Sequence, residues 1–219
     1  MVFGINRGRS LYNSSFIHFS QPSPNTRDQL YNLAVVTPAA EPVTWQELAD
    51  QLRLDGSDDQ PYVTALGIAG RMYVEASTKL TLVSTTYDVS YDVLDNNGIR
   101  LPRRPVTAVA SVKYIDQQGT QQTLSPSLYD IDTKSIWTTI RPKPNIAFPV
   151  TTFSPNAVTV RFTAGTATDA ASVSPLAKLA ITSWVAHQYE NREAVTAGKM
   201  EALPLALESI LWLLSSPGV

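Results

Sequence analysis

The spacing of apolar residues changes twice along this chain, and these changes restrict the fold more than any other feature of the sequence. From Pro61 to Lys79 apolar residues recur every three or four positions, which is typical of a helix. From Leu80 the period becomes two and Val, Ile, Thr and Tyr are frequent, which is typical of strands. At Ser174 the helical period returns. Helices on both sides of a block of strands predict an α+β fold rather than a parallel α/β sheet.

Two helices are predicted before the strands. The first covers 44–54, because Thr44 and Glu47 in TWQE match a capping box. Gly56 is expected to end this helix in the left-handed conformation, and the second helix begins near Pro61. Its apolar stripe is the face that an amphipathic helix turns to the core. The stripe contains Tyr62, Leu66, Ala69, Tyr73 and Ala76.

Two helices are also predicted after the strands. Ser174 is suited to cap the first of them and Pro175 to occupy its first position. This helix is expected to run to about Thr196, and the last helix covers 203–214. The apolar face of the first contains Leu176, Ala177, Ala180, Ile181, Trp184 and Val185.

The block between the helices predicts an antiparallel sheet of about five strands. Asn97-Gly98 and Gln118-Gly119 mark turns within it. The two prolines of LPRRPV place that segment at an edge or a crossing, where Arg103 and Arg104 are expected to aid solubility or protect the edge rather than bind phosphate. The strand segments are LTLVSTTYDVSYDVL, TAVASVKYID, LYDID, SIWTTIRP and AVTVRFTAG.

These segments predict three regions. Residues 43–80 and 173–215 form a small helical bundle of two N-terminal and two C-terminal helices, and 81–172 form the inserted antiparallel β-region. Residues 1–42, rich in Ser, Asn and Pro, form an extended N-terminal arm. Composition leaves open whether the arm is a disordered tail or becomes ordered on a partner.

The stretch AHQYENREAV, 186–195, is the strongest candidate for an active site, because it concentrates a His, a Tyr, two Glu and an Arg. A hydrolase needs a nucleophile with its base, or two carboxylates across a cleft. Glu190 and Glu193 lie one turn apart on one helix, and His187 has no H-E-x-x-H companion. We therefore predict no catalytic, cofactor-binding or metal-binding residues. Arg192 is predicted to pair with a neighbouring Glu or with another subunit.

Composition excludes further classes. The chain has no cysteine, which excludes disulfides and thiolate metal sites. Its net charge of −2 provides no bulk attraction for nucleic acid. Charged residues make up only 16% of the sequence, a low share that favours contacts between subunits. No apolar run approaches the roughly eighteen residues of a membrane span, and no signal peptide is expected.

The last helix, LPLALESILWLL, is more apolar than a single buried stripe requires. Two interpretations stay open. All of its faces are buried in the protein's own core, or one face packs inside while the other contacts another subunit. The candidate partner contacts are Leu205, Ile210, Leu211, Trp212, Leu213 and Leu214, together with Arg192 and Glu193.

The segment VTWQELADQLRLDGSDDQPYVTALGIAGRMYVEASTKLTLVSTTYDV resembles the opening of the head–tail connector (adaptor) proteins of long-tailed bacteriophages and gene-transfer particles. The middle of that family is similar to IRLPRRPVTAVASVKYIDQQGTQQTLSPSLYDID, and its close to AVTVRFTAG, AITSWVAHQYENREAV and LPLALESIL. The resemblance covers roughly residues 42–215, with YENREAV as its most specific fragment. It does not cover the N-terminal arm.

The resemblance implies a virion structural protein of the particle neck, assembled in the host cytoplasm. It implies a homo-oligomeric ring, commonly of about twelve copies, beneath the portal protein. The ring would extend the DNA channel and support the next neck or tail protein. Genomic DNA would pass without sequence-specific binding, and neither a membrane nor a catalytic residue is implied.

Two other classes of function remain to be weighed. The first is a tail or baseplate β-rich binding module, which an aromatic-lined groove around Trp137 would favour. The second is a carboxylate-based hydrolase, which two acidic side chains facing each other across a cleft would favour.

Overall fold

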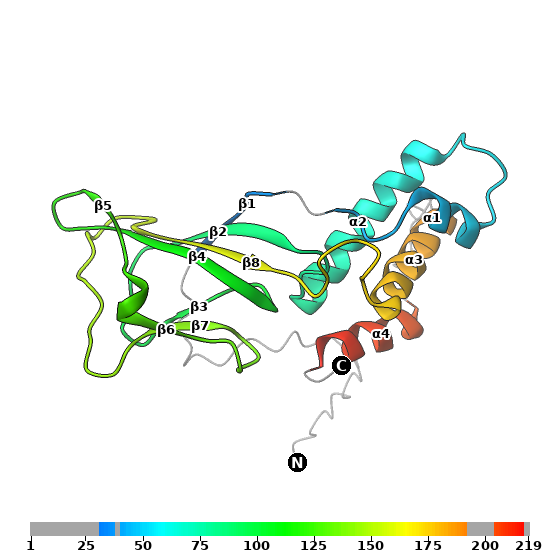
Figure 1. Ribbon diagram of the computed structural model, residues 1–219. Coiled ribbons are helices and arrows are strands. Elements are labelled where there is room, and N and C mark those ends of the chain that lie inside the picture. The colour runs from blue at the N-terminus through cyan, green and yellow to red at the C-terminus, as the bar shows by residue number, and fades with distance from the viewer. Residues whose placement is uncertain (1–30, 38–39, 192–203, 217–219) are drawn as a thin grey trace, which may run out of the picture.

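A computed structural model describes residues 31–37, 40–191 and 204–216 of the chain. A β part built of two sheets lies beside a part built of helices (Figure 1). All strand pairs are antiparallel, so the predicted α+β class with an antiparallel β-region is confirmed.

The larger sheet has five strands in the order β1-β2-β8-β4-β5. Its strands are β1 (Tyr31–Val35), β2 (Thr85–Tyr91), β8 (Val158–Ala164), β4 (Val106–Ile115) and β5 (Gln121–Thr123). The smaller sheet has the order β3-β7-β6. Its strands are β3 (Ile99–Arg100), β7 (Thr139–Pro142) and β6 (Tyr129–Asp132).

The expectation of a single sheet of about five strands is wrong. Side chains alternate between buried and partly exposed along β2 and β8, so the larger sheet has one strongly apolar face. The smaller sheet covers that face, and Ile99, Leu101 and Ile140 complete the core from its side. The rings of Tyr87 on β2 and Phe162 on β8 stack with their centroids 5.5 Å apart. An apolar sheet face requires such a second layer.

Part of the predicted arm belongs to the larger sheet. β1 pairs with β2, with Leu33 opposite Val89, and forms one margin of the sheet. Residues 1–30 of the predicted arm lie outside the described residues. The short β1 sequence YNLAV lacks a clear alternating pattern, and pairing with β2 determines its structure.

In the described residues four helices form the other part of the molecule, two before β2 and two after β8, as predicted. They are α1 (Trp45–Leu52), α2 (Gln60–Thr78), α3 (Pro175–Glu190) and α4 (Leu205–Ser215). α2 contacts the three others. α1 ends two residues before the predicted Leu54, and its left-handed C-cap is Arg53 rather than Gly56, because the N–H of Arg53 returns to carbonyls of the last turn. α3 ends at Glu190, before the predicted Thr196, which lies outside the described residues.

Side-chain caps begin two of these helices as predicted. The backbone N–H of Glu47 donates to the Thr44 hydroxyl at 3.2 Å, and Glu47 accepts from the backbone N–H of Thr44 at 2.7 Å. At α3 the Ser174 hydroxyl accepts from the N–H of Ala177 at 3.2 Å. Glu47 also accepts from Lys178 Nζ of α3 at 2.9 Å, so the capping box links α1 to α3.

The predicted α2 stripe lies at the margin of the buried face rather than at its centre. Leu66 packs partly buried against the helical core, and the ring of Tyr73 stacks on Trp184 of α3. Tyr62 and Ala76 are exposed, whereas the buried positions include Gly67 and Gly70. A Cβ on Gly70 would lie 3.1–3.3 Å from Trp184, Ile181 and Val185 of α3. α2 therefore comes close to α3 at Gly70, which has no side chain, and Gly67 gives the same close approach to Leu48 of α1. A hydrophobicity pattern does not identify such a face.

We expect the stability contribution of Glu47 to depend on pH. The hydrogen bond from Lys178, followed by that from the Thr44 backbone, lowers the pKa of Glu47 below its ordinary 4.5. A lowered folded-state pKa stabilises the fold above the unfolded-state pKa, and this contribution disappears as the pH falls through the folded-state value. Glu47→Gln should lower the free energy of unfolding by up to about 1 kcal/mol at neutral pH. In urea titrations the difference should vanish in acid, whereas the exposed Glu190→Gln should show little effect at either pH.

We expect a large side chain at Gly70 to destabilise the bundle. Gly70→Leu should lower the free energy of unfolding by about 1–3 kcal/mol, because the facing α3 side chains must move. Ala65→Leu places the same side chain on the exposed side of α2 and should leave the thermal midpoint nearly unchanged. Equal midpoints for both variants would contradict the close approach of α2 and α3.

Candidate functional site

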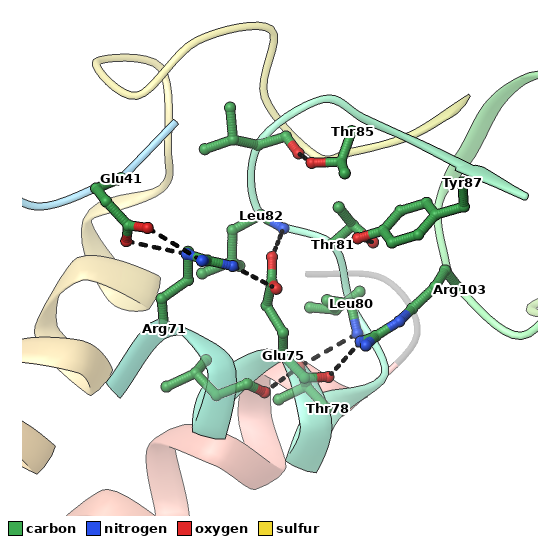
Figure 2. Close-up of polar contacts among 12 residues, drawn as sticks. Glu41, Arg71, Glu75, Thr78, Leu80, Thr81, Leu82, Thr85, Tyr87 and Arg103 are labelled. Carbon is green, nitrogen blue, oxygen red and sulfur yellow. Dashed lines mark hydrogen bonds and ion pairs between the residues drawn. The ribbon is translucent and has the colours of Figure 1, made fainter. Parts of the chain in front are cut away.

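The junction between the helices and the strands is built around a buried carboxylate. Glu75 of α2 is 5% exposed and accepts from the backbone N–H of Leu82 at 2.9 Å and from Arg71 Nη1 at 3.1 Å. Arg71 also donates two hydrogen bonds of 3.0 Å to Glu41. Figure 2 shows Arg71 between the two carboxylates, with Glu75 reaching the Leu82 amide. One chain of contacts therefore joins the segment before α1, α2 and the segment that leads to β2.

Arg71 stays charged within this network. Burial alone would lower the pKa of Arg71, but hydrogen bonds and charge attraction from Glu41 and Glu75 outweigh it and raise the pKa above its ordinary value. Two carboxylates and one guanidinium in contact satisfy the donors and acceptors that burial removes from water. The network is structural and contains no reactive group.

Arg103 and Arg104 bind helix carbonyls, so their predicted role in solubility or edge protection is wrong. Arg104 Nη2 donates to the carbonyls of Thr78 and Ser215 at 3.1 and 2.7 Å, and these are the last residues of α2 and α4. Arg103 Nη1 donates to the Glu75 carbonyl at 3.3 Å. Carbonyls at helix C-termini lack intrahelical donors and carry partial negative charge, which explains why a guanidinium binds there. Arg104 thereby positions the end of α4.

We expect removal of the Glu75 carboxylate to destabilise the junction strongly. Glu75→Ala leaves the Leu82 amide without its acceptor and takes one carboxylate from Arg71. The free energy of unfolding should therefore fall by about 3 kcal/mol in denaturant titration. Glu190→Ala removes an exposed carboxylate and is the matched control, for which we expect little change. A loss below about 0.5 kcal/mol for Glu75→Ala would contradict the assigned role.

α4 has two different sides. Leu207 is buried, and Ile210, Leu211 and Leu214 are partly buried against the helical core. On the other side Leu205, Trp212 and Leu213 are 81%, 71% and 39% exposed. Leu205 and Trp212 are seven positions apart and lie on one face of the helix. We call Leu205, Trp212 and Leu213 the α4 surface. Of the predicted partner contacts, these three are open to solvent, and Arg192 and Glu193 lie outside the described residues.

A pocket of about 670 Å³ lies at the C-terminal end of α4. Leu214 and Ser216 contribute to its wall, and Arg104 and Val106 line it from the segment that leads into β4. Leu176 at the start of α3 and residues 133–138 between β6 and β7 close the other sides. The half-exposed Ile136 is part of this wall. The junction between the two parts therefore presents an apolar depression next to an apolar helix.

The AHQYENREAV stretch supplies helix-end contacts in the part that is described. Asn191 Nδ2 donates to the His187 carbonyl at 2.8 Å, and Tyr189 donates to Asp59 before α2. Glu190 is exposed. Across 31–37, 40–191 and 204–216, no group of three or more His, Asp or Glu residues is placed to hold a metal ion. In the same residues no helix has the length and apolar character needed to cross a bilayer.

The fold has counterparts among solved particle structures. A chain in a structure described as "Virion of native gene transfer agent (GTA) particle" has a TM-score of 0.69 and 19% identity, over 85% of this chain and 96% of that one. Chains in "Neck of empty GTA particle computed with C6 symmetry" and "Neck of native GTA particle computed with C12 symmetry" have TM-scores of 0.70 and 0.62. Both are 19% identical, over 86% of this chain and 97% of theirs. No protein-family model and no curated protein matches the chain.

The sequence left open whether the last helix is fully buried or has an exposed side, and the structure exposes Leu205, Trp212 and Leu213. The excess of leucines in α4 was the signal for the exposed side. The pocket was missed because segments from α3, α4 and the β-region form it together. The roles of Arg103 and Arg104 depend on helix ends that lie far away in the sequence, and only their unusual position between two prolines distinguishes them.

Proposed function

We propose that this protein is a virion structural protein of a particle neck, a head–tail connector that forms a ring of about twelve copies between the portal and the tail or the next neck protein. The observation that carries the proposal is the shared fold. It extends over 85–86% of this chain and 96–97% of chains from gene transfer agent particle and neck structures. Such a protein would assemble in the host cytoplasm and stay in the particle.

The surfaces of the molecule support a role in assembly. A ring built from identical copies needs two unlike surfaces on each copy, and a further surface must meet the portal. The three side chains of the α4 surface are large and apolar, and the exposed Glu208 lies between Leu205 and Trp212 on the same face. Exposed large apolar side chains beside a polar one are typical of a protein–protein interface. We assign it to the portal protein, because α4 belongs to the helical part of the molecule, whereas both open edges belong to the β part (Figure 1).

The charge of the chain agrees with a passage for DNA. A net charge of −2 produces no strong attraction for phosphates, so DNA inside such a ring would move without being held. Sequence-specific binding is not part of the proposal.

The two rival functions have less support. A tail or baseplate binding module was expected to show an aromatic groove around Trp137. Instead the guanidinium groups of Arg100 and Arg104 lie 4.1 and 5.5 Å from the centre of its ring. A hydrolase was expected to show two carboxylates facing each other across a cleft. The acidic side chains at the junction, Glu41 and Glu75, both bind Arg71.

We expect loss of the α4 surface to abolish portal binding without unfolding the protein. In Leu205→Ser/Trp212→Ser both changes are at exposed positions, so the thermal midpoint should stay within a few degrees of the wild type. Affinity for the purified portal protein of the same particle should fall at least about a hundredfold, as is typical when central apolar contacts are truncated. Native mass spectrometry of the protein, alone and with portal, measures both binding and ring size.

Phe153→Ser is the matched control, because Phe153 is fully exposed in the loop between β7 and β8, away from α4. It should bind portal like the wild type. Unchanged portal binding by the α4 double variant would refute the assignment of that surface. Absence of any ring-sized species for the wild type, alone or with portal, would refute the connector function itself.

A further inference from the structure

We propose that neighbouring copies join through the two open edges of the five-stranded sheet, with β1 of one copy pairing with β4 of the next. The partner is a second copy of this chain. The inference rests on the ring proposed above and identifies the contact that closes it. In this arrangement the sheets of successive copies form one continuous β-structure around the ring.

Both edges are open in the described residues. β1 is the outermost strand on one side, as Figure 1 shows. On the other side β5 pairs with β4 only at Lys113–Ile115, and Leu124 N–H donates to the Val112 carbonyl at 2.8 Å. Within the part of the chain that the structure describes, residues 106–111 of β4 therefore have no strand partner on that side. This open stretch is similar in length to β1, which has 5 residues.

The strand directions of the two edges are compatible. β1 is antiparallel to β2, β2 to β8 and β8 to β4, so β1 and β4 of one copy run in opposite directions. A rotation that makes the next sheet a continuation of the first keeps the direction of each strand. β1 of the next copy therefore meets β4 in antiparallel orientation, like every other pair in this sheet.

The backbone of β1 has groups available for this pairing. Val36 N–H donates to the Thr86 carbonyl at 2.9 Å. Because antiparallel pairing alternates, the N–H groups of Leu33 and Val35 then point to the open side. An open row of such groups is a template for another strand, and proteins usually protect it with charged residues. Neither YNLAV nor residues 106–111, VTAVAS, contain a charged residue.

The side chains and the shape of β4 agree with this pairing. Leu33 on β1 and Val109 on β4 are partly buried hydrophobic residues at opposite margins of the same β core. Val35 is 59% exposed. Pairing between copies would cover these margins with apolar side chains. The register of β4 is irregular between Val106 and Ala108 and between Val109 and Ser111, and bulges of this kind curve a sheet, as a closed ring requires.

The first test blocks one open donor of β1. In Val35→Pro the N–H on the open side is lost, while the bonds from β1 to β2 remain possible. Val35→Thr keeps that N–H and is the matched control. With the portal protein present, we expect Val35→Thr to form the ring and Val35→Pro to need at least about tenfold more protein. Circular dichroism and the thermal midpoint show whether Val35→Pro is folded.

The second test traps the contact, and it does not depend on the proline variant. The chain has no cysteine of its own, so within the ring the introduced thiols are the only ones that this protein contributes. Ala34→Cys is combined with Ala108→Cys or with Ser111→Cys, because these positions lie on the outer face of the sheet, opposite its apolar core. Oxidation of assembled particles should give a ladder of covalent multimers on a non-reducing gel for one of the two pairs. Ala34→Cys with Gln118→Cys is the control and should give none.

Three outcomes would overturn the inference. In the first, Val35→Pro is folded and assembles normally, and no ladder forms with either cysteine pair. The edge pairing is then wrong while the ring remains. In the second, Ala34→Cys alone gives covalent dimers, so that β1 pairs with β1 about a two-fold axis. In the third, the wild type forms no ring, which removes the connector function together with the edge pairing.

Discussion

The hydrogen bond from the Leu82 amide to the buried Glu75 carboxylate is the contact on which the arrangement of the two parts depends. It joins the end of the helical segment to the start of the strands, where the period of the sequence changes. Arg71 donates a hydrogen bond to the same carboxylate, and Glu41 binds Arg71 in turn. Burial of the Glu75 carboxylate without these partners would destabilise the fold. The network therefore favours the arrangement of sheet and helices in which all of its contacts form.

The class of fold could be predicted because it depends on local patterns. The capping box at Thr44, the Ser174-Pro175 start of α3 and the alternation along β2 each act within a few residues. The second sheet could not be predicted, because β3, β6 and β7 are short and are held by pairing and by a shared core. The centre of the buried face of α2 was also missed, since its close approach to α3 is made by Gly70, which carries no hydrophobic signal.

The candidate site also combines features that depend on local sequence with features that depend on distant contacts. An excess of leucine over one helical stripe indicated an exposed side of α4, and Leu205, Trp212 and Leu213 occupy it. The open sheet edges could not be predicted from the sequence, because they depend on the order of the strands in the sheet and not on a local pattern. In the proposed ring, the α4 surface and the two edges would give each copy three different contacts. A neck component needs this number if it must bind two copies of itself and a third protein.

α4 is attached to the helical core through few fully buried side chains. Its side chains include a single fully buried residue, Leu207, and Arg104 is the side chain that holds its last carbonyl. The free energy of local opening is smallest where few apolar contacts are buried, so we expect α4 to open more easily than the helical core as a whole unfolds. Binding through this helix would then also determine its position, and the same chain could fit portal surfaces that differ in angle.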